Sequence, residues 1–137
     1  MEEQKDVRSY NVGGSDYAKH KYQVWDIVRM YGLNFFEGNM IKYLLRRKEG
    51  NDRMMDLRKI EHYLEYYSQI DCVRTDFSAG KFVEIDEALK DYDINRLERK
   101  LAEKIVQIGE YEEDEYRDRL IDDAKYIVQS LILIESL

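Results

Sequence analysis

Seven lysine or arginine residues lie between positions 42 and 59 of this chain, and only three acidic residues accompany them. We call residues 42–59 the basic segment. Its cations suit phosphate oxygens, and the tyrosines close to them could stack on a base. The chemistry to expect is recognition of a phosphorylated ligand with an aromatic part, such as a nucleotide. A solvated helix face with a few ion pairs would show the same charge pattern.

Helical spacing gathers the candidate residues onto two faces, because side chains three or four positions apart are neighbours on a helix. The first face would carry an amide, a ring and two cations, and the second a carboxylate, a cation and a ring. The two sets are Asn39, Lys42, Tyr43 and Arg46, then Asp56, Lys59 and Tyr63. If the two helices fold back on each other through the turn at 48–52, the faces could form one pocket.

The elements that must position these faces are helices. Proline is absent and 37% of the residues are charged, a combination that favours helices with wet outer sides. Apolar spacing predicts a first helix over 24–31, ended by Gly32 in a left-handed cap. A second helix is expected over about 39–47, capped by Asn34 or Asn39, and a third from a cap at Asp52 to about residue 70.

The second half of the chain continues the helical pattern. Residues 84–92 predict a short helix, and a longer one follows, capped by Asp93 and ended by Gly109. A last helix carries Tyr116 through Leu131. Residues 1–16 are expected to form a loose arm, and residues 72–82 a loop between the halves. The predicted fold is all-α, a small helical domain in which residues 1–71 are followed by an acidic helical hairpin at 72–137.

The end of the last helix, LILIESL, is apolar nearly all round. A helix without a wet side is usually covered, either by the rest of its own fold or by a second chain. Because a long helical hairpin at the end of a small protein favours the second, we expect a homo-oligomer.

The overall charge limits the classes of partner that the chain is expected to bind. The chain holds 22 basic and 29 acidic residues; residues 1–71 carry 12 of each, and residues 72–137 carry 10 basic against 17 acidic, a net of −7. An acidic chain lacks the broad basic face that duplex nucleic acid requires. No run approaches the ~18 apolar residues of a membrane span. One cysteine and two histidines predict neither a disulfide nor a metal site, which suits the cytoplasm.

The stretch from about residue 15 to 67 resembles a short domain of unknown function found in tailed bacteriophages, a family that includes a podophage nucleotide kinase. The matching residues, in order, are Tyr17, Asp26, Gly32, Leu33, Asn34, Phe35, Gly38, Asn39, Lys42, Tyr43, Arg46, Lys48, Asp56, Leu57, Lys59, Tyr63 and Leu64. One branch of the family phosphorylates deoxynucleoside monophosphates. The resemblance therefore implies a nucleotide ligand, a nucleoside triphosphate donor if the chain is a kinase, and a place in the infected bacterial host.

These expectations assign roles to the two faces. Lys42, Arg46, Lys48 and Lys59 would neutralise phosphates, because the chain lacks a phosphate-binding loop of the form Gly-x-x-x-x-Gly-Lys-Ser/Thr. As a kinase, the chain would use Arg46, Lys59 and Asp56 for catalysis, with Asp56 holding Lys59 or receiving a ligand hydroxyl. Asn39 would orient the ligand, and Tyr43 and Tyr63 would offer rings. The same residues fit a non-enzymatic nucleotide sponge or an inhibitor of a host protein.

A second enzyme hypothesis comes from the acidic half. Glu84 and Glu87, then Glu115 and Asp118, resemble the paired carboxylates of the MazG-like nucleotide pyrophosphatases. Four carboxylates from two helices would hold magnesium. Among 17 acidic residues such spacings also arise by chance, so solvated helix faces are the preferred interpretation and a need for magnesium stays open.

Overall fold

The computed structural model describes residues 20–47, 50, 52–70, 83–109 and 115–137. Within these residues it contains six helices and no strand, which confirms the predicted all-α class. The predicted arm at 1–16, the predicted loop at 72–82 and Lys48 lie outside the described residues. In chain order the helices are α1 (Val24–Tyr31), α2 (Phe35–Leu45), α3 (Arg53–Tyr67), α4 (Ile85–Ala88), α5 (Arg96–Ile108) and α6 (Glu115–Glu135).

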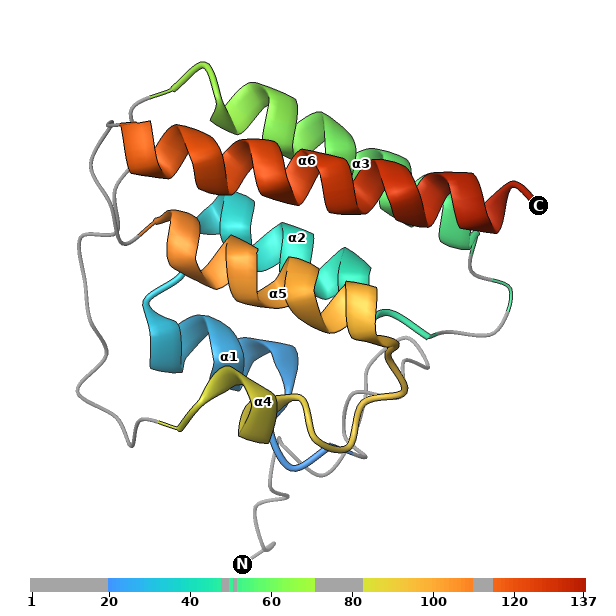
Figure 1. Ribbon diagram of the computed structural model, residues 1–137. Helices are drawn as coiled ribbons and strands as arrows, with labels where there is room; N and C mark the ends of the chain where they lie inside the picture. Colours follow the sequence, from blue (N-terminus) through green and yellow to red (C-terminus); the bar gives the residue numbers. More distant parts are fainter. Residues whose placement is uncertain (1–19, 48–49, 51, 71–82, 110–114) are drawn as a thin grey trace, which may run out of the picture.

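The helices form two layers, one from each half of the chain (Figure 1). In the first layer α2 packs between α1 and α3, and in the second α5 packs between α4 and α6. The layers meet where α3 packs on α6 and α2 on α5. The close packing of α5 along α6 confirms the predicted C-terminal hairpin. Both layers contribute to one hydrophobic core, with Leu44 and Ile60 from the first and Leu101 and Val128 from the second.

Local capping sets the ends of the first two helices. Gly32 ends α1 with φ of 60°, the left-handed cap that the sequence predicts. Asn34 caps α2: its Oδ1 accepts the N–H of Glu37 at 2.8 Å, and the Glu37 carboxylate accepts the N–H of Asn34 at 3.1 Å. Asn34 was one of the two predicted caps and is confirmed, whereas the prediction that this helix begins near residue 39 is wrong by about one turn. The helix runs through Gly38, where a Cβ atom would lie 3.2 Å from Val28 of α1.

Later caps follow the same chemistry. Asp52 caps α3 as predicted, because its Oδ1 accepts the N–H of Met55 at 3.1 Å, although the helix ends at Tyr67 rather than near residue 70. The predicted cap of α5 at Asp93 is wrong. Asn95 caps this helix, in a reciprocal pair with Glu98 in which both hydrogen bonds measure 2.9 Å.

The start of the described chain is fastened to the loop before α5. Asp91 accepts a hydrogen bond from the backbone N–H of Lys21 at 2.9 Å and lies 3.0 Å from Nδ1 of His20. The His20 ring also stacks on Tyr92, with centroids 3.7 Å apart. We call these contacts the N-terminal latch. Partial burial acts to raise the pKa of Asp91, but the bonds from Lys21 and His20 outweigh it, and this pKa is lowered.

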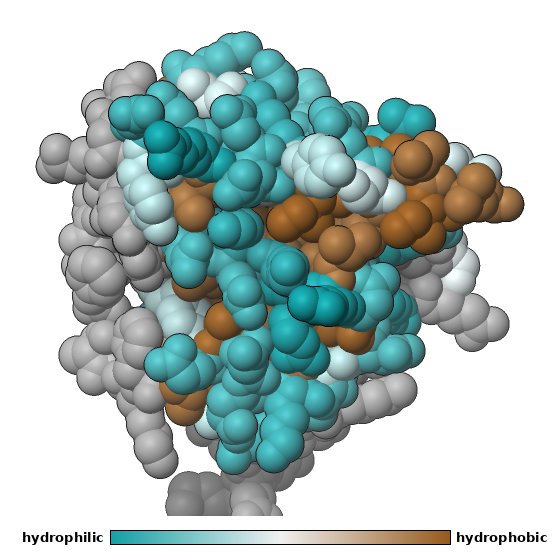
Figure 2. All heavy atoms as spheres, viewed as in Figure 1, coloured by the Kyte–Doolittle hydropathy of each residue, from teal (hydrophilic) through white to brown (hydrophobic). Residues whose placement is uncertain are grey.

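The C-terminal end of α6 carries apolar side chains that its own chain leaves exposed. Leu131 is buried in the core, whereas Leu133 and Ile134 are 66% and 55% exposed and Leu137 is 99% exposed. Figure 2 shows apolar side chains gathered over this end of α6. Self-association through this surface stays a prediction. No helix in the described part of the chain combines the length and apolar character that crossing a membrane requires.

Candidate functional site

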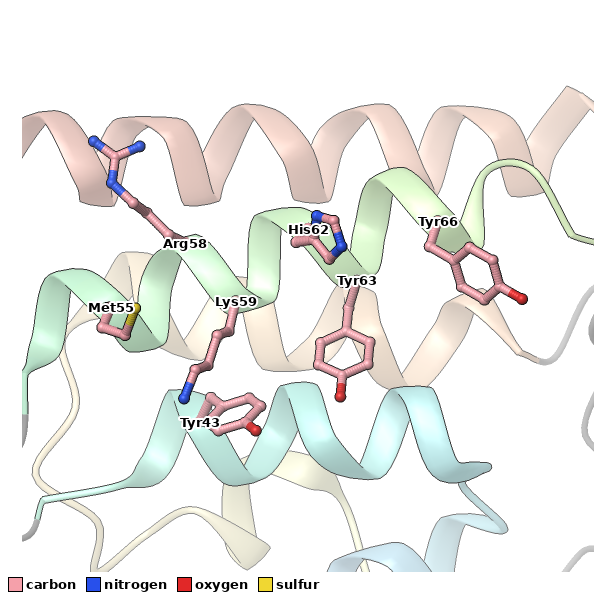
Figure 3. Close-up of a pocket in the computed structure, with 7 residues that line it drawn as sticks. All are labelled: Tyr43, Met55, Arg58, Lys59, His62, Tyr63 and Tyr66. Atoms are coloured by element: carbon pink, nitrogen blue, oxygen red, sulfur yellow. The ribbon is translucent and has the colours of Figure 1, made fainter.

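An open pocket of about 470 Å³ lies on the outer face of the first layer, where α3 runs beside α2 (Figure 3). This volume falls within the ~300–1,000 Å³ of typical small-molecule sites. Tyr43 lines it from α2, and α3 supplies the remaining side chains at intervals of three and four residues, which place them along one side of the helix. These are Met55, Arg58, Lys59, His62, Tyr63 and Tyr66.

The structure brings four of the predicted site residues together. The Nζ atom of Lys59 lies 5.0 Å from the centroid of the Tyr43 ring. Tyr43 and Tyr63 are stacked, with centroids 6.2 Å apart and planes inclined by 27°. Asn39 Nδ2 donates a hydrogen bond of 3.4 Å to the Tyr63 hydroxyl. The two helices therefore fold back on each other as expected, and one cation is held against the Tyr43 ring of the stacked pair.

Arg46 and Asp56 form an ion pair beside this group. Arg46, the residue that follows α2, places Nη1 3.9 Å from Oδ1 of Asp56, which is 1% exposed. Neither side chain lines the pocket. This ion pair links the end of α2 to the first turn of α3, and it gives Asp56 a partner other than the expected Lys59.

Lys42 and Lys48 are the two remaining predicted ligand contacts. Lys42 is exposed on α2, next to Tyr43 in the sequence, and does not line the pocket. Lys48 lies outside the described residues. Of the four cations assigned to phosphate binding, Lys59 is the one that the structure places in the pocket wall.

Two other cations of the basic segment bind a carboxylate of α5, a role that the sequence analysis missed. Glu98 is 5% exposed, and its Oε2 accepts hydrogen bonds from Arg47, at 2.6 Å, and from Arg53. Arg53 also donates to the carbonyl oxygen of Tyr43 at 2.9 Å. Burial and the neighbouring Arg47 lower the pKa of Arg53, and Glu98 opposes that shift. These arginines hold the layers together rather than facing a ligand.

Four residues of the pocket wall were not predicted from the sequence, namely Met55, Arg58, His62 and Tyr66. Their positions, together with that of Lys59, follow the three- and four-residue spacing of one helix face, which was a usable signal. Tyr67 is buried, whereas Tyr66 is 47% exposed, so the adjacent tyrosines differ in role. Arg58 and Lys59 leave α3 in different directions and border the pocket on two sides (Figure 3).

A hydrogen-bonded network behind the pocket fixes α2 against α3. The Tyr67 hydroxyl donates to Oε2 of Glu37 at 2.8 Å, and Asn34 Nδ2 donates to the Tyr67 oxygen at 3.3 Å. Glu37 is fully buried, and its carboxylate finds inside the protein the hydrogen-bond partners that a buried polar group needs. Because the network joins the cap of α2 to the last turn of α3, it holds the two helices that carry the pocket in register.

The carboxylates of the pyrophosphatase hypothesis lie on different elements. Glu84 directly precedes α4, without a side-chain capping bond, and Glu87 lies within this helix, whereas Glu115 and Asp118 are in the first turn of α6. Within the described residues, no group of three or more histidine, cysteine, aspartate or glutamate side chains is placed to hold a metal ion. The magnesium hypothesis stays a prediction.

Comparisons with protein-family models, with curated proteins and with solved structures found no match to this chain. The resemblance to the tailed-phage domain stays a prediction. Its matching residues divide by position: Gly32 and Asn34 form helix caps, whereas Tyr43, Lys59 and Tyr63 line the pocket.

Proposed function

We propose that this protein binds a nucleotide in the pocket between α2 and α3. The observation that carries the proposal is the Lys59 ammonium group, which lies against the Tyr43 ring at the edge of an open pocket walled by tyrosines. A phosphate requires a cation with free N–H donors, and a base requires aromatic surface. The pocket offers both within one ligand-sized volume.

The geometry suggests how the ligand would lie. The phosphate binds at Lys59, with Arg58 as the second cation bordering the pocket. The base packs against the exposed surfaces of Tyr63 and Tyr66, farther along α3. Asn39 acts as a positioning residue, because its amide is bonded to the Tyr63 hydroxyl and orients that ring.

Binding is better supported than phosphoryl transfer. Of the three residues expected to be catalytic, Lys59 lines the pocket, whereas Arg46 and Asp56 are paired with each other outside it. The family resemblance supports a kinase-like role on deoxynucleoside monophosphates in the cytoplasm of an infected bacterium. The pocket itself supports binding, which a kinase and a nucleotide sponge share.

Isothermal titration calorimetry with deoxynucleoside monophosphates tests the binding proposal. Lys59→Met should weaken binding about 10- to 100-fold, because a charge-assisted contact contributes about 1.5–3 kcal/mol. Lys100→Met is the matched control, since Lys100 is an exposed lysine on α5. Equal affinities for wild type and Lys59→Met, with both folded by circular dichroism, would refute the site.

A second experiment separates a kinase from a sponge. The protein is incubated with a monophosphate, a nucleoside triphosphate and magnesium, and the products are separated by chromatography. A kinase converts the monophosphate to a diphosphate, in which the γ-phosphoryl group of the donor is transferred to the acceptor phosphate. A sponge returns both nucleotides unchanged after the protein is denatured.

A further inference from the structure

Aromatic side chains continue beyond the pocket along the same face. The Phe36 ring lies 5.3 Å from that of Tyr66 and 6.2 Å from that of Tyr63, measured between centroids. Phe35 follows at 5.7 Å from Phe36 and is 71% exposed. With the stacked Tyr43 and Tyr63, these contacts form a continuous series of rings across α2 and α3. We call this series the aromatic row; it comprises Phe35, Phe36, Tyr43, Tyr63 and Tyr66.

Cations accompany the aromatic row on both helices. Lys42 lies seven residues, about two turns, from Phe35, so the two exposed side chains share one side of α2. Lys59 and Arg58 border the row on α3. No carboxylate is among the residues that line the pocket; Asp56 is buried beside Arg46, and Glu65 pairs with Lys125 of α6 at 2.9 Å. The face is therefore locally cationic although the chain carries a net charge of −7.

The length of the face exceeds that of one nucleotide. From Met55 to Tyr66 the α3 strip covers eleven residue steps, or about 16 Å at the rise of an α-helix. A stacked nucleic acid strand rises about 3.4 Å per nucleotide. Three or more nucleotides fit along this distance, and a monophosphate would leave the rings of Phe35 and Phe36 unused.

We propose that the face of α2 and α3 binds a short single-stranded oligonucleotide, with successive bases on the aromatic row and phosphates on Lys42, Arg58 and Lys59. This inference rests on the proposed nucleotide site and extends it. Interleaved rings and cations are the means by which proteins hold single strands, because every base has a face that can stack. A duplex hides those faces, so the proposal agrees with the expectation that the chain does not bind duplex nucleic acid.

Ligand length is the first test. Calorimetric titration with oligothymidylates and oligouridylates of one to six nucleotides should show affinity rising at least about fivefold per added nucleotide up to the third or fourth, then levelling off. With three cations engaged, log K against log salt should fall with a slope of about −2. The two series distinguish DNA from RNA as the source of the strand.

Two single-residue variants test whether the gain in affinity with ligand length comes from the aromatic row. Phe35→Ala should weaken trinucleotide binding about 5- to 150-fold and leave mononucleotide binding unchanged, because Phe35 lies outside the pocket. Tyr126→Ala is the control, since Tyr126 is similarly exposed at 73% but belongs to α6. It should change neither affinity.

The outcomes separate the two proposals. If a trinucleotide binds no more tightly than a monophosphate, the extended site is refuted and the proposed function stands. If trinucleotides bind with the expected loss in Phe35→Ala and monophosphates do not bind, the pocket acts only as part of the extended site, and the proposal that it binds a single nucleotide by itself is refuted. If neither ligand binds, both are refuted. If Phe35→Ala leaves trinucleotide affinity unchanged, the oligonucleotide proposal is overturned. If the same variant also lowers the mass in light scattering, the aromatic row is a protein contact.

Discussion

Glu98→Ala should strongly destabilise this fold, because Glu98 is a buried charged residue that joins the two layers. The Glu98 carboxylate lies between the two layers, where it accepts hydrogen bonds from both Arg47 and Arg53. Its other oxygen accepts the N–H of Asn95 and so caps α5. The substitution removes all three bonds and leaves two guanidinium groups facing each other beside an apolar core.

The size of the expected loss in stability follows from the burial of Glu98. Removing one partner of a buried ion pair costs about 3–5 kcal/mol, and losing a capping interaction costs about 1 kcal/mol. The side chains of Arg47 and Arg53 are 32% and 18% exposed, so water can partly solvate the two guanidinium groups and reduces the cost of breaking the ion pair. We expect a total loss of about 3 kcal/mol, a large part of the ~5–15 kcal/mol that stabilises a typical domain. The melting temperature should fall by about 10 °C.

Urea denaturation followed by circular dichroism measures this loss. An unchanged slope against urea concentration would show that the same surface is exposed on unfolding. Glu65→Ala is the matched control, because Glu65 also bridges two helices, pairing with Lys125 at 2.9 Å, but its side chain is 63% exposed. It should cost less than about 1 kcal/mol. A loss in Glu98→Ala no larger than that in Glu65→Ala would refute the assignment of these arginines to the fold.

Three further predictions follow. Arg46→Ala should lower the free energy of unfolding by about 1–3 kcal/mol in urea denaturation, because it removes an ion-pair partner of the buried Asp56; a loss below about 0.5 kcal/mol would contradict this. Asp91→Asn should destabilise the protein by less than about 1 kcal/mol at pH 7 and by still less at pH 3. Because the pKa of the Asp91 carboxyl is lowered in the folded state, its contribution to stability is complete above the ordinary pKa of about 4 and is lost as the pH falls through the lowered pKa. An equal effect of Asp91→Asn at both pH values would contradict the N-terminal latch. If the apolar end of α6 mediates self-association, Leu133→Asp should lower the mass measured by light scattering without unfolding the chain, and a monomeric wild type would contradict it.

Most of the fold could be predicted from local signals in the sequence. The apolar spacing of the first helix and the cap at Gly32 were predicted correctly, as was the cap at Asp52. These features depend on contacts within one turn, which a sequence displays directly. The start of α2 was placed about one turn too late, because residues 33–39 interrupt the apolar spacing. Gly38 in this stretch belongs to the helix, and its place depends on the close approach of α1 at Val28, which neighbouring residues do not reveal.

The candidate site was predictable in part for the same reason. Tyr43, Lys59 and Tyr63 follow from helical spacing and from one assumption about how two helices fold back. Arg47 and Arg53 could not be assigned, because their partner Glu98 lies 51 and 45 positions away in the chain. A charge pattern shows that cations are present but not which of them face a carboxylate from another layer.

The measurement that tests the central claim most directly is a two-dimensional NMR titration of nitrogen-15-labelled protein with a deoxynucleoside monophosphate. The pocket predicts that backbone resonances of α2 and α3 around Tyr43, Lys59 and Tyr63 shift in proportion to ligand bound, while those of α5 and α6 stay in place. Resonances that do not move at millimolar ligand, or shifts concentrated on α5 and α6, would contradict the account.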